Sequence, residues 1–412
     1  MLTLLFGTDW VANRDAVLDM LASDVKQHKK NRILIVPELI SHDTERRLCA
    51  AAGNTASRYA EVLSFTRLAN RVAESVGHAA LQCMDNGGRL VAMASAIRQL
   101  HSKIKAYASV ETKPEFLSGL VDAIDEFKRC CIGAGDLMDA SKHSEGSLAQ
   151  KLEELSLIYE CYDAICSHGK KDPRDQMNWL LEELESGDFA SEHVFYIDGF
   201  PDFTRQHLAI LVHLICHAEN VVISLNCDRV NSDRLAFEKA GETAGELVKA
   251  AKKYGIEVVT EQIPARHDDL SGLREHLFQG EIHEKISCEC LSLCTADSLY
   301  HECSAAAERI MELVRNGARY RQIGVVCADP GYATTLEMIL QRCRIPAYFS
   351  GTEPVLGKTV IATVLAAMDA AFGRFESEDV IRYLKSPLSP LSMEMCDKVE
   401  NYATLWSIRG DA

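Results

Sequence analysis

Short apolar runs alternate with amphipathic segments along residues 1–77. The apolar runs predict buried strands, at LTLLF (2–6), ILIV (33–36) and EVLSF (61–65). The amphipathic segments predict helices, over 11–29, from about His42 and from Thr66. Strands that alternate with helices form parallel sheets with right-handed crossovers, so we expect an α/β fold built on a parallel sheet.

Strand-like runs are missing from 78–189. Apolar residues in this part follow the helical period in four segments, at 89–107, 115–131, 147–168 and 174–185. Strand-like runs then return, at 193–198, 220–226 and 256–259. We therefore predict one parallel-sheet domain formed by 1–77 and 190–260, with a helical domain, 78–189, inserted into it.

A polar stretch at 261–285 predicts a linker to a second unit, 286–412. The second unit again alternates the two patterns, with strands predicted at 286–294, 323–327 and 347–349. Its helices are predicted at 302–316, 332–343, 358–372 and 377–385. We expect the start of a second α/β domain, truncated because no closing element follows the last helix.

The composition is typical of a globular protein, because 47% of the 412 residues are hydrophobic and 25% are charged. No apolar run approaches the ~20 residues that cross a bilayer, so no membrane contact is expected. The N-terminus also lacks the basic segment of a secretory signal. Fifteen cysteines without such a signal indicate reduced thiols and a cytoplasmic location.

The net charge of −16 disfavours a chain that wraps DNA over its whole surface. The charge is unevenly distributed, however. Residues 1–72 contain ten Lys and Arg against eight Asp and Glu, whereas 73–192 contain twelve against twenty-one. Since screening limits the reach of distant charges to ~8–10 Å, the first segment is the better candidate for binding a DNA strand.

The first strand-to-helix turn is where a phosphate-binding P-loop would lie. That motif requires glycines, a lysine for the phosphates and a Ser or Thr for magnesium. Here the turn is GTDWVANRD, in which Gly7 is kept and the Gly-Lys-Thr end is replaced by residues such as Asn13, Arg14 and Asp15. We interpret Gly7, Thr8 and Arg14 as parts of a degenerate nucleotide site. An atypical ATP-binding loop is the alternative.

Acidic residues strengthen this interpretation, because Asp9 and Asp15 in the turn would repel phosphate. The later strand 193–198 ends in Asp198, where a magnesium-associated Asp would project. Gly199 follows it, so a carboxylate that could orient the attacking water is missing there. Asp198 is otherwise a buried or capping residue. We predict no ATP hydrolysis, no catalytic residue and no bound nucleotide.

Four cysteines lie close together in the second unit, at Cys288, Cys290, Cys294 and Cys303. Most of them fall in ISCECLSLC, which alternates like a strand, and their spacing matches no common zinc or iron–sulfur pattern. Cysteine in a strand behaves as a small apolar residue. We therefore predict packing and no metal site.

Polar and basic residues follow two of the predicted strands, in the turns Glu38–Thr44 and Thr66–Arg71. Such groups at strand ends and helix N-termini suit contacts with nucleic-acid phosphates. A solvated face, with Thr66 as an ordinary N-cap, explains the same pattern.

Five segments, in order, resemble the N-terminal part of AddB, the RexB/AddB subunit of bacterial AddAB-type helicase–nucleases. They are ILIVPE, LSFTRLANRV, DAIDEFKRCCI, KLEELSLIYECY and YIDGFPDFT. The later segment HECSAAAERIMELVRNGARYRQIGVVCADPGYATTLEMILQRCRIPAYF is similar to the start of the second motor-like domain of UvrD-type helicases. The resemblance carried by these segments extends over nearly the whole chain.

The resemblance implies a RecA-like domain 1A that is split by a helical domain 1B and followed by the start of 2A and 2B. It implies a role in double-strand-break processing and recombination, on single-stranded and double-stranded DNA. An AddA/RexA-type partner would supply the ATP-driven motor, while the AddB-type subunit scans the passing strand as an inactive helicase. The family uses ATP, magnesium and an iron–sulfur cluster, but its nuclease domain and cluster cysteines lie downstream, so no cofactor is expected here.

The family's strand channel, which recognises a Chi-type signal, gives four candidate DNA-binding residues. The loop after VP and the Arg of the SF-S/T-R segment correspond to Thr44 and Arg67, with Asn70 and Phe200 nearby by alignment. Asn70 occupies a place that is often aromatic in the family, which argues against base stacking there. A protein–protein scaffold in a repair complex is the other function that the sequence allows.

Overall fold

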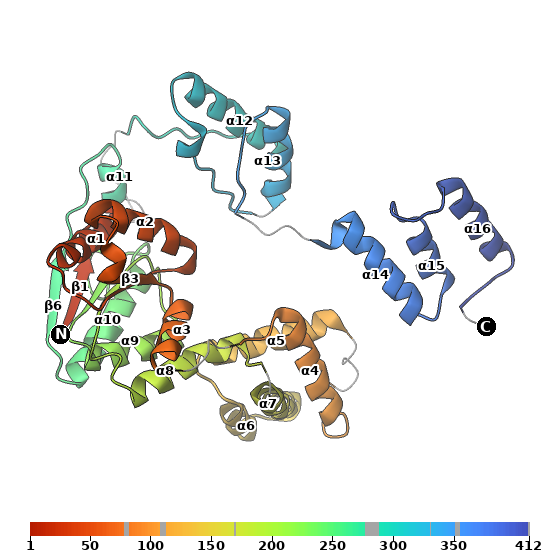
Figure 1. Ribbon diagram of the computed structural model, residues 1–412, viewed down its shortest axis with the longest axis horizontal. Helices are drawn as coiled ribbons and strands as arrows, with labels where there is room; N and C mark the ends of the chain where they lie inside the picture. Colours follow the sequence, from red (N-terminus) through yellow and green to blue (C-terminus); the bar gives the residue numbers. More distant parts are fainter. Residues whose placement is uncertain are drawn as a thin grey trace. The chain divides into compact units, whose positions relative to one another are not determined.

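The structure is a computed structural model that describes residues 1–77, 82–107, 113–168, 170–276, 288–329, 331–350 and 355–410 (Figure 1). The chain divides into two compact units, Met1–Ser292 and Leu293–Ala412. The α-helices of the first unit are α1 (Trp10–Lys26), α2 (Ser41–Ala52), α3 (Phe65–Ser75), α4 (Asn86–Leu100), α5 (Pro114–Arg129), α6 (Ala134–Lys142), α7 (Gly146–Ser167), α8 (Gln176–Ser186), α9 (Arg205–His217), α10 (Glu238–Lys253) and α11 (Ser271–His276). Short 3-10 turns are η1 (Glu38–Ile40), η2 (Ala56–Arg58) and η4 (Pro173–Asp175).

Six parallel strands form one sheet in the first unit, in the order β3-β2-β4-β5-β1-β6. They are β1 (Leu2–Phe6), β2 (Arg32–Ile35), β3 (Ala60–Leu63), β4 (Val194–Ile197), β5 (Val221–Leu225) and β6 (Val258–Gln262). The pairing of β2 with β4 brings Arg32 opposite Val194, so the sheet is completed only after the helical region. The predicted α/β fold with a parallel sheet is confirmed.

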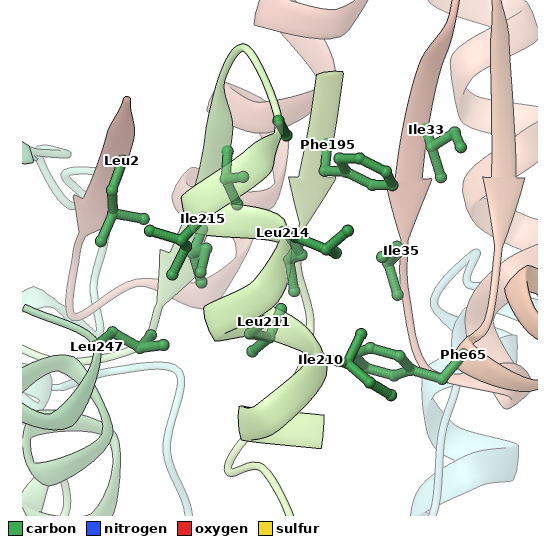
Figure 2. Close-up of a cluster of buried hydrophobic side chains, with 14 of the residues drawn as sticks. Leu2, Ile33, Ile35, Phe65, Phe195, Ile210, Leu211, Leu214, Ile215 and Leu247 are labelled. Carbon is green, nitrogen blue, oxygen red and sulfur yellow. The ribbon is translucent and has the colours of Figure 1, made fainter. Parts of the chain in front are cut away.

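Helices cover both faces of the sheet, which explains why its strands are apolar in continuous runs rather than in alternation. On one face Leu34 of β2 packs in a core with Leu21 of α1. On the other face Ile35 of β2 and Phe195 of β4 share a core with Leu214 of α9 (Figure 2). Successive residues of a strand point to opposite faces, so the five strands from β1 to β5 contribute to both cores, whereas the edge strand β6 is mostly exposed.

The turn from β3 to α3 differs from the prediction in two details. The strand ends at Leu63 rather than at Phe65, and the N-cap of α3 is Ser64 rather than Thr66. The reason is that Ser64 Oγ accepts a hydrogen bond from the backbone N–H of Arg67 at 3.2 Å. Phe65 is thereby the first helical residue and is buried in the core beneath the sheet.

Helices α4 to α7 form a separate core within the first unit, around Met93, Ile97, Ile124 and Ile158. Among the described residues between β3 and β4, the backbone pairing typical of a sheet is limited to one isolated β-bridge. Helix α8 packs instead against α3 and α9, and its apolar side chains join the core of the sheet.

A buried ionic network joins the helices of this region. Arg89 of α4 pairs with Asp125 of α5, and its Nη2 lies 3.2 Å from Oδ2 of Asp172. Lys128 Nζ lies 3.6 Å from the same oxygen, and the Tyr162 hydroxyl of α7 donates to it at 2.7 Å. All five residues are buried. Since removing one partner of a buried pair costs about 3–5 kcal/mol, the network fixes α4, α5 and α7 relative to one another.

The second unit contains α12 (Leu299–Arg315), α13 (Gly331–Arg342), α14 (Thr359–Phe372), α15 (Ser377–Leu384) and α16 (Met393–Leu405), with 3-10 turns η5 (Tyr320–Gln322) and η6 (Val355–Gly357). The described residues from 288 onward form no strand, so the strands predicted at 323–327 and 347–349, and over 288–294, are wrong; 286 and 287 lie outside the described residues. Val326 and Tyr348 are 96% and 91% exposed. An apolar run becomes a strand only when a neighbouring strand pairs with its backbone groups.

Within the described ranges, no helix is both long and apolar enough to span a membrane. The same residues contain no group of three or more His, Cys, Asp or Glu side chains arranged to hold a metal ion. Cys303 is buried between α12 and α13. Cys290 and Cys294 are exposed, so the strand packing predicted for them is wrong, because the strand itself does not form.

Candidate functional site

The carboxyl ends of parallel strands meet at one edge of a sheet, and the loops that follow them form the usual binding region of such folds. In the first unit this edge contains the turn from β1 to α1, the segment from β2 to α2, the turn from β3 to α3, and the residues that follow β4 and β5. All the predicted site residues lie in these loops or in the first two turns of the helices that follow them.

Asp9 occupies the N-terminus of α1. Its Oδ1 accepts hydrogen bonds from the backbone N–H groups of Val11 and Ala12, at 3.0 and 3.4 Å. Arg266, from the segment after β6, donates Nε to Oδ2 at 2.7 Å and Nη2 to Oδ1 at 3.1 Å. Desolvation favours the neutral acid, but the bonds from Arg266 outweigh it and hold the pKa of Asp9 well below its usual range.

The side chain of Asn13 also holds the turn from β1 to α1 together. Counted from Gly7, it stands at the place of the P-loop lysine. Its buried Nδ2 donates to the carbonyl oxygens of Gly7 and Leu225, at 3.0 and 3.3 Å. A Cβ atom on Gly7 would lie 1.9 Å from Asn13 Oδ1, so Gly7 is required by this contact. Thr8 is half-buried in the turn between them.

A cavity of about 230 Å³ opens beside this turn, at the ends of β4 and β5. We call it the edge cavity; its main lining residues are Trp10, Arg14, Asp198, Phe200, Ser224 and Asn226. The structure thus brings Arg14 and Asp198 of the predicted nucleotide site together with Phe200 of the predicted DNA site. Gly7 and Thr8 belong to the adjacent turn.

Asp198 is 7% exposed and lines the edge cavity. Burial raises the pKa of its carboxyl group, although the Ser224 hydroxyl and the Gly199 N–H act in the opposite direction. Gly199 has a φ of +81° and lies against Ile40 and Pro37, so a side chain there would be strained and would collide with the loop after β2.

Arg67 lies in a different part of the edge. Its side chain is exposed at the start of α3 and lines a cavity of about 190 Å³ together with Leu48 and Cys49 of α2. Thr44 lies one turn before Leu48 on α2 and is 4% exposed, so its side chain is buried. The Ser64 hydroxyl donates to the carboxylate of Glu38, which ties the loop after β2 to the turn that presents Arg67.

Asn70 and Phe200 are held by neighbouring side chains. Asn70 Oδ1 accepts a hydrogen bond from Gln176 Nε2 at 3.4 Å, which connects α3 to the start of α8. The Phe200 ring lies 5.5 Å from Phe65 in an edge-to-face arrangement and 5.1 Å from Phe203. Phe200 is therefore fixed in place where it lines the edge cavity.

Trp10 and Arg266 contribute to this region but were not predicted from the sequence as site residues. Trp10 had a signal, since a large aromatic residue directly after a strand-to-helix turn is unusual on a solvated face. Arg266 had none, because it lies 257 residues from Asp9 and falls in a polar stretch that predicted a linker.

Comparisons with known proteins agree with this architecture. The family described as "ADDB, N-terminal" matches residues 6–274. Several proteins named as one subunit of an ATP-dependent helicase/deoxyribonuclease are similar over most of the chain. The one from Acetivibrio thermocellus is 27% identical over 396 residues, covering 92% of this chain and 34% of its own length. The one from Heliobacterium modesticaldum is 26% identical over 434 residues, covering 99% and 36%.

A third such protein, from Caldanaerobacter subterraneus, is 28% identical over 396 residues and covers 92% of this chain. The chain spans about a third of the length of these relatives, between 34% and 36%. The family match covers more than half of the chain and includes the whole sheet except residues 2–5 of β1. The resemblance seen in the sequence is thereby confirmed, and the chain belongs to the AddB N-terminal family.

Proposed function

We propose that this chain is the inactive helicase-like, DNA-scanning portion of an AddB-type subunit that acts in double-strand-break processing and recombinational repair. In this proposal, 1–77 and 190–260 form a RecA-like domain 1A, 78–189 is the insertion 1B, and 286–412 begins 2A and 2B. The observation that supports it most is the turn from β1 to α1, which is closed by Asp9, Asn13 and Arg266.

The residues of this turn do not fit a nucleoside triphosphate. The N–H groups at the start of a P-loop helix bind phosphate, but Asp9 already accepts those of Val11 and Ala12. Asn13 replaces the lysine and is used to hold two carbonyl oxygens. The adjacent edge cavity of about 230 Å³ is also smaller than the ~300–1,000 Å³ of sites for drug-sized ligands. This argues against the atypical-ATPase alternative.

The proposed binding of a DNA strand is supported by the loops after β2 and β3, which lie at the same edge of the sheet. Arg67 is exposed at the start of α3, where a guanidinium would contact a phosphate or a base edge. The link between Glu38 and Ser64 holds this turn in place. Phe200 would face the strand from the edge cavity, while Asn70 and Thr44 would support it from α3 and α2.

The proposed partners rest on the relatives, whose names describe one subunit of a helicase and deoxyribonuclease. We propose an AddA/RexA-type protein as the partner that supplies the motor, with single-stranded and double-stranded DNA as ligands. ATP and magnesium would act in that partner, and the family's iron–sulfur cluster would belong to another part of the AddB-type protein.

A scaffold role is favoured by one feature of the second unit. Val360, Val364, Met368 and Phe372 are spaced four residues apart along α14, and all are exposed. Such an apolar stripe on a helix is typical of a surface that another protein covers. This role is compatible with strand binding in the first unit.

The experiment that tests the proposed function is equilibrium binding of a short single-stranded DNA to the chain in complex with its AddA-type partner, over a range of salt concentrations. An affinity that falls steeply with salt is expected. The chain alone should show no steady-state ATP hydrolysis at saturating magnesium and ATP. Turnover by the chain that Asp198→Ala abolishes would contradict the inactive-site part of the proposal.

A further inference from the structure

We propose that His213 and His217, at the C-terminal end of α9, form a binding site for one transition-metal ion of the zinc, nickel or copper class. The two histidines are four residues apart, so they lie on the same face of the helix. Helix α9 ends at His217, shortly before β5 begins at Val221. The pair therefore lies toward the amino ends of the strands, away from the loops proposed to bind DNA, and the inference is independent of the proposed function.

The two imidazole rings are close together, and each has one nitrogen free. Their centres lie 4.1 Å apart, and their planes are 22° from parallel. His217 Nδ1 bonds to the backbone carbonyl oxygen of His213 at 2.9 Å. His213 makes a hydrogen bond with the carbonyl oxygen of Leu184, and its buried Nε2 has no partner among the described residues. Since a carbonyl oxygen only accepts, Nδ1 of each ring carries the proton and Nε2 carries the lone pair that a metal ion needs.

Metal-binding histidines are usually held in this way. Such a histidine donates its other ring N–H to a backbone carbonyl or a carboxylate, which fixes the tautomer and the orientation of the ring. A buried polar atom without a partner in the protein calls for another one, such as a water molecule or an ion. Because the side chain of His217 is exposed, an ion can reach the pair from solvent. Two histidines with this spacing on a helix are also the pair that binds zinc in metalloproteases. Here Leu214 stands where those enzymes have their catalytic Glu, so no hydrolysis is implied.

His213 is held in the neutral form that binds metals. Burial lowers the pKa of His213 below its usual value, and the neighbouring His217 acts in the same direction, although Glu185 and the Leu184 carbonyl oppose them. A histidine must be neutral to be a ligand, so little proton release is needed at neutral pH. The pair also belongs to the last turn of α9, where the negative end of the helix dipole favours a cation.

The surrounding side chains favour one class of metal. The pair lines a cavity of about 860 Å³ between α8, α9 and α10. The charged residues in its lining are Glu185, Glu246, Arg205, Lys249 and Lys253. Three cations against two carboxylates disfavour Mg²⁺ or Ca²⁺, which require oxygen ligands. Imidazole nitrogens suit zinc, nickel and copper instead. The two histidines supply two ligands, so water would fill the remaining positions.

Isothermal titration calorimetry of the full chain with Ni²⁺ tests the site, after the protein is treated with a chelator that is then removed. At pH 7 we expect saturable binding of one Ni²⁺ ion, and no saturable binding of Mg²⁺. His213→Ala and His217→Ala should each weaken Ni²⁺ binding by at least about tenfold, because even the loss of an outer partner of a metal ligand costs that much. Since His217 is exposed, His217→Ala should fold even if His213→Ala does not.

His143→Ala is the matched control. His143 is also exposed, and its Nδ1 also bonds to the carbonyl oxygen four residues before it, that of Asp139 at 2.9 Å. This change should leave Ni²⁺ affinity unchanged. A second measurement is the midpoint of urea denaturation, which Ni²⁺ should raise in the parent protein and in His143→Ala but not in His217→Ala.

The outcomes are distinct from those of the DNA experiments. Absence of saturable Ni²⁺ binding at pH 7 would overturn the site. Equal Ni²⁺ affinity of the parent protein and of His217→Ala would also overturn it, because the ion would then be held elsewhere, for example by cysteines. Binding that is lost in His217→Ala and weakens between pH 7 and pH 5, where protons compete for imidazole, would support it. Single-strand affinity should be unchanged in His217→Ala whichever result is obtained.

Discussion

Arg266 donates hydrogen bonds to both carboxylate oxygens of Asp9, at 2.7 and 3.1 Å, although 257 residues separate the two in the chain. The same carboxylate caps α1. The positive end of this helix therefore has its own anion, at the place where a P-loop would bind phosphate. The contact also ties the segment after β6 to the first turn of the domain.

Breaking this contact should cost stability without changing the fold. Arg266→Ala is expected to lower the free energy of unfolding only slightly, since the guanidinium is half exposed and solvent screens part of the interaction. Asp9→Ala should cost about 1–2 kcal/mol because it also removes the N-cap. Urea denaturation measures both. Arg229→Ala, which breaks an exposed pair with Asp233, is the matched control and should cost less.

Asn13→Ala should destabilise the first unit by about 1–3 kcal/mol, the cost of one unsatisfied buried group. The change removes the side-chain donor to the carbonyl oxygen of Gly7, while the carbonyl oxygen of Leu225 still accepts from the N–H groups of Gly7 and Cys227. The midpoint of chemical denaturation is the measurement, with exposed Asn54→Ala as control. If Asn13→Ala matches that control, the hydrogen bonds do not hold the turn closed.

The sheet could be predicted from the sequence because its strands are short, apolar and buried on both faces. LTLLF shows this, since Leu4 and Leu5 point into the cores on opposite sides of the sheet. The same rule failed at 323–327, where the run is equally apolar but has no strand beside it in the described residues. The local pattern of apolar residues indicates that a segment suits a strand. It does not indicate which neighbouring strand would pair with that segment.

The candidate site was predictable to a smaller extent. The loss of the P-loop lysine was visible at Asn13, and Asp198 and Phe200 were both predicted as site residues, although not as neighbours in one cavity. The contribution of Arg266 was not visible, because contacts between distant segments are set by the fold. The burial of Thr44 was also missed, since the sequence does not say which side of α2 faces the sheet.

Lys128→Met should be strongly destabilising. Burial favours the neutral amine, but Asp175, Asp172 and Asp163 raise the pKa of Lys128 above its usual value, so the buried group stays charged. Its removal takes the cation away from Asp163 and Asp175 and leaves Asp172 with Arg89 as its cation, at an expected cost of about 3–5 kcal/mol. Lys142→Met removes an exposed pair with Asp139 and should cost at most about 1 kcal/mol. Similar midpoints of urea denaturation for the two variants would show that the network is not a structural link.

His207 should make the stability depend on pH. Burial against Phe65 lowers the pKa of His207 from 6.5 to about 4. Between these values the unfolded chain binds a proton that the folded chain does not, so stability is complete above pH ~6.5 and falls as the pH approaches 4. The shift corresponds to roughly 3 kcal/mol.

The free energy of unfolding, measured by urea denaturation from pH 4 to pH 7, checks this expectation. His207→Phe should flatten the profile in that window, whereas His143→Gln, at an exposed position, should leave it unchanged. A profile that is as steep in His207→Phe as in the parent protein would show that other groups cause the dependence.

The measurement that tests the account most directly is the salt dependence of single-strand affinity for the complex of this chain with its AddA-type partner. Arg67→Ala is compared with Lys249→Ala, which changes a lysine of α10 away from the strand-binding loops. We predict that Arg67→Ala either reduces the slope of log affinity against log salt by about one, if it contacts phosphate, or costs roughly 1–3 kcal/mol for the preferred sequence, if it contacts a base. Identical behaviour of Arg67→Ala and Lys249→Ala at every salt concentration would contradict the proposed strand site.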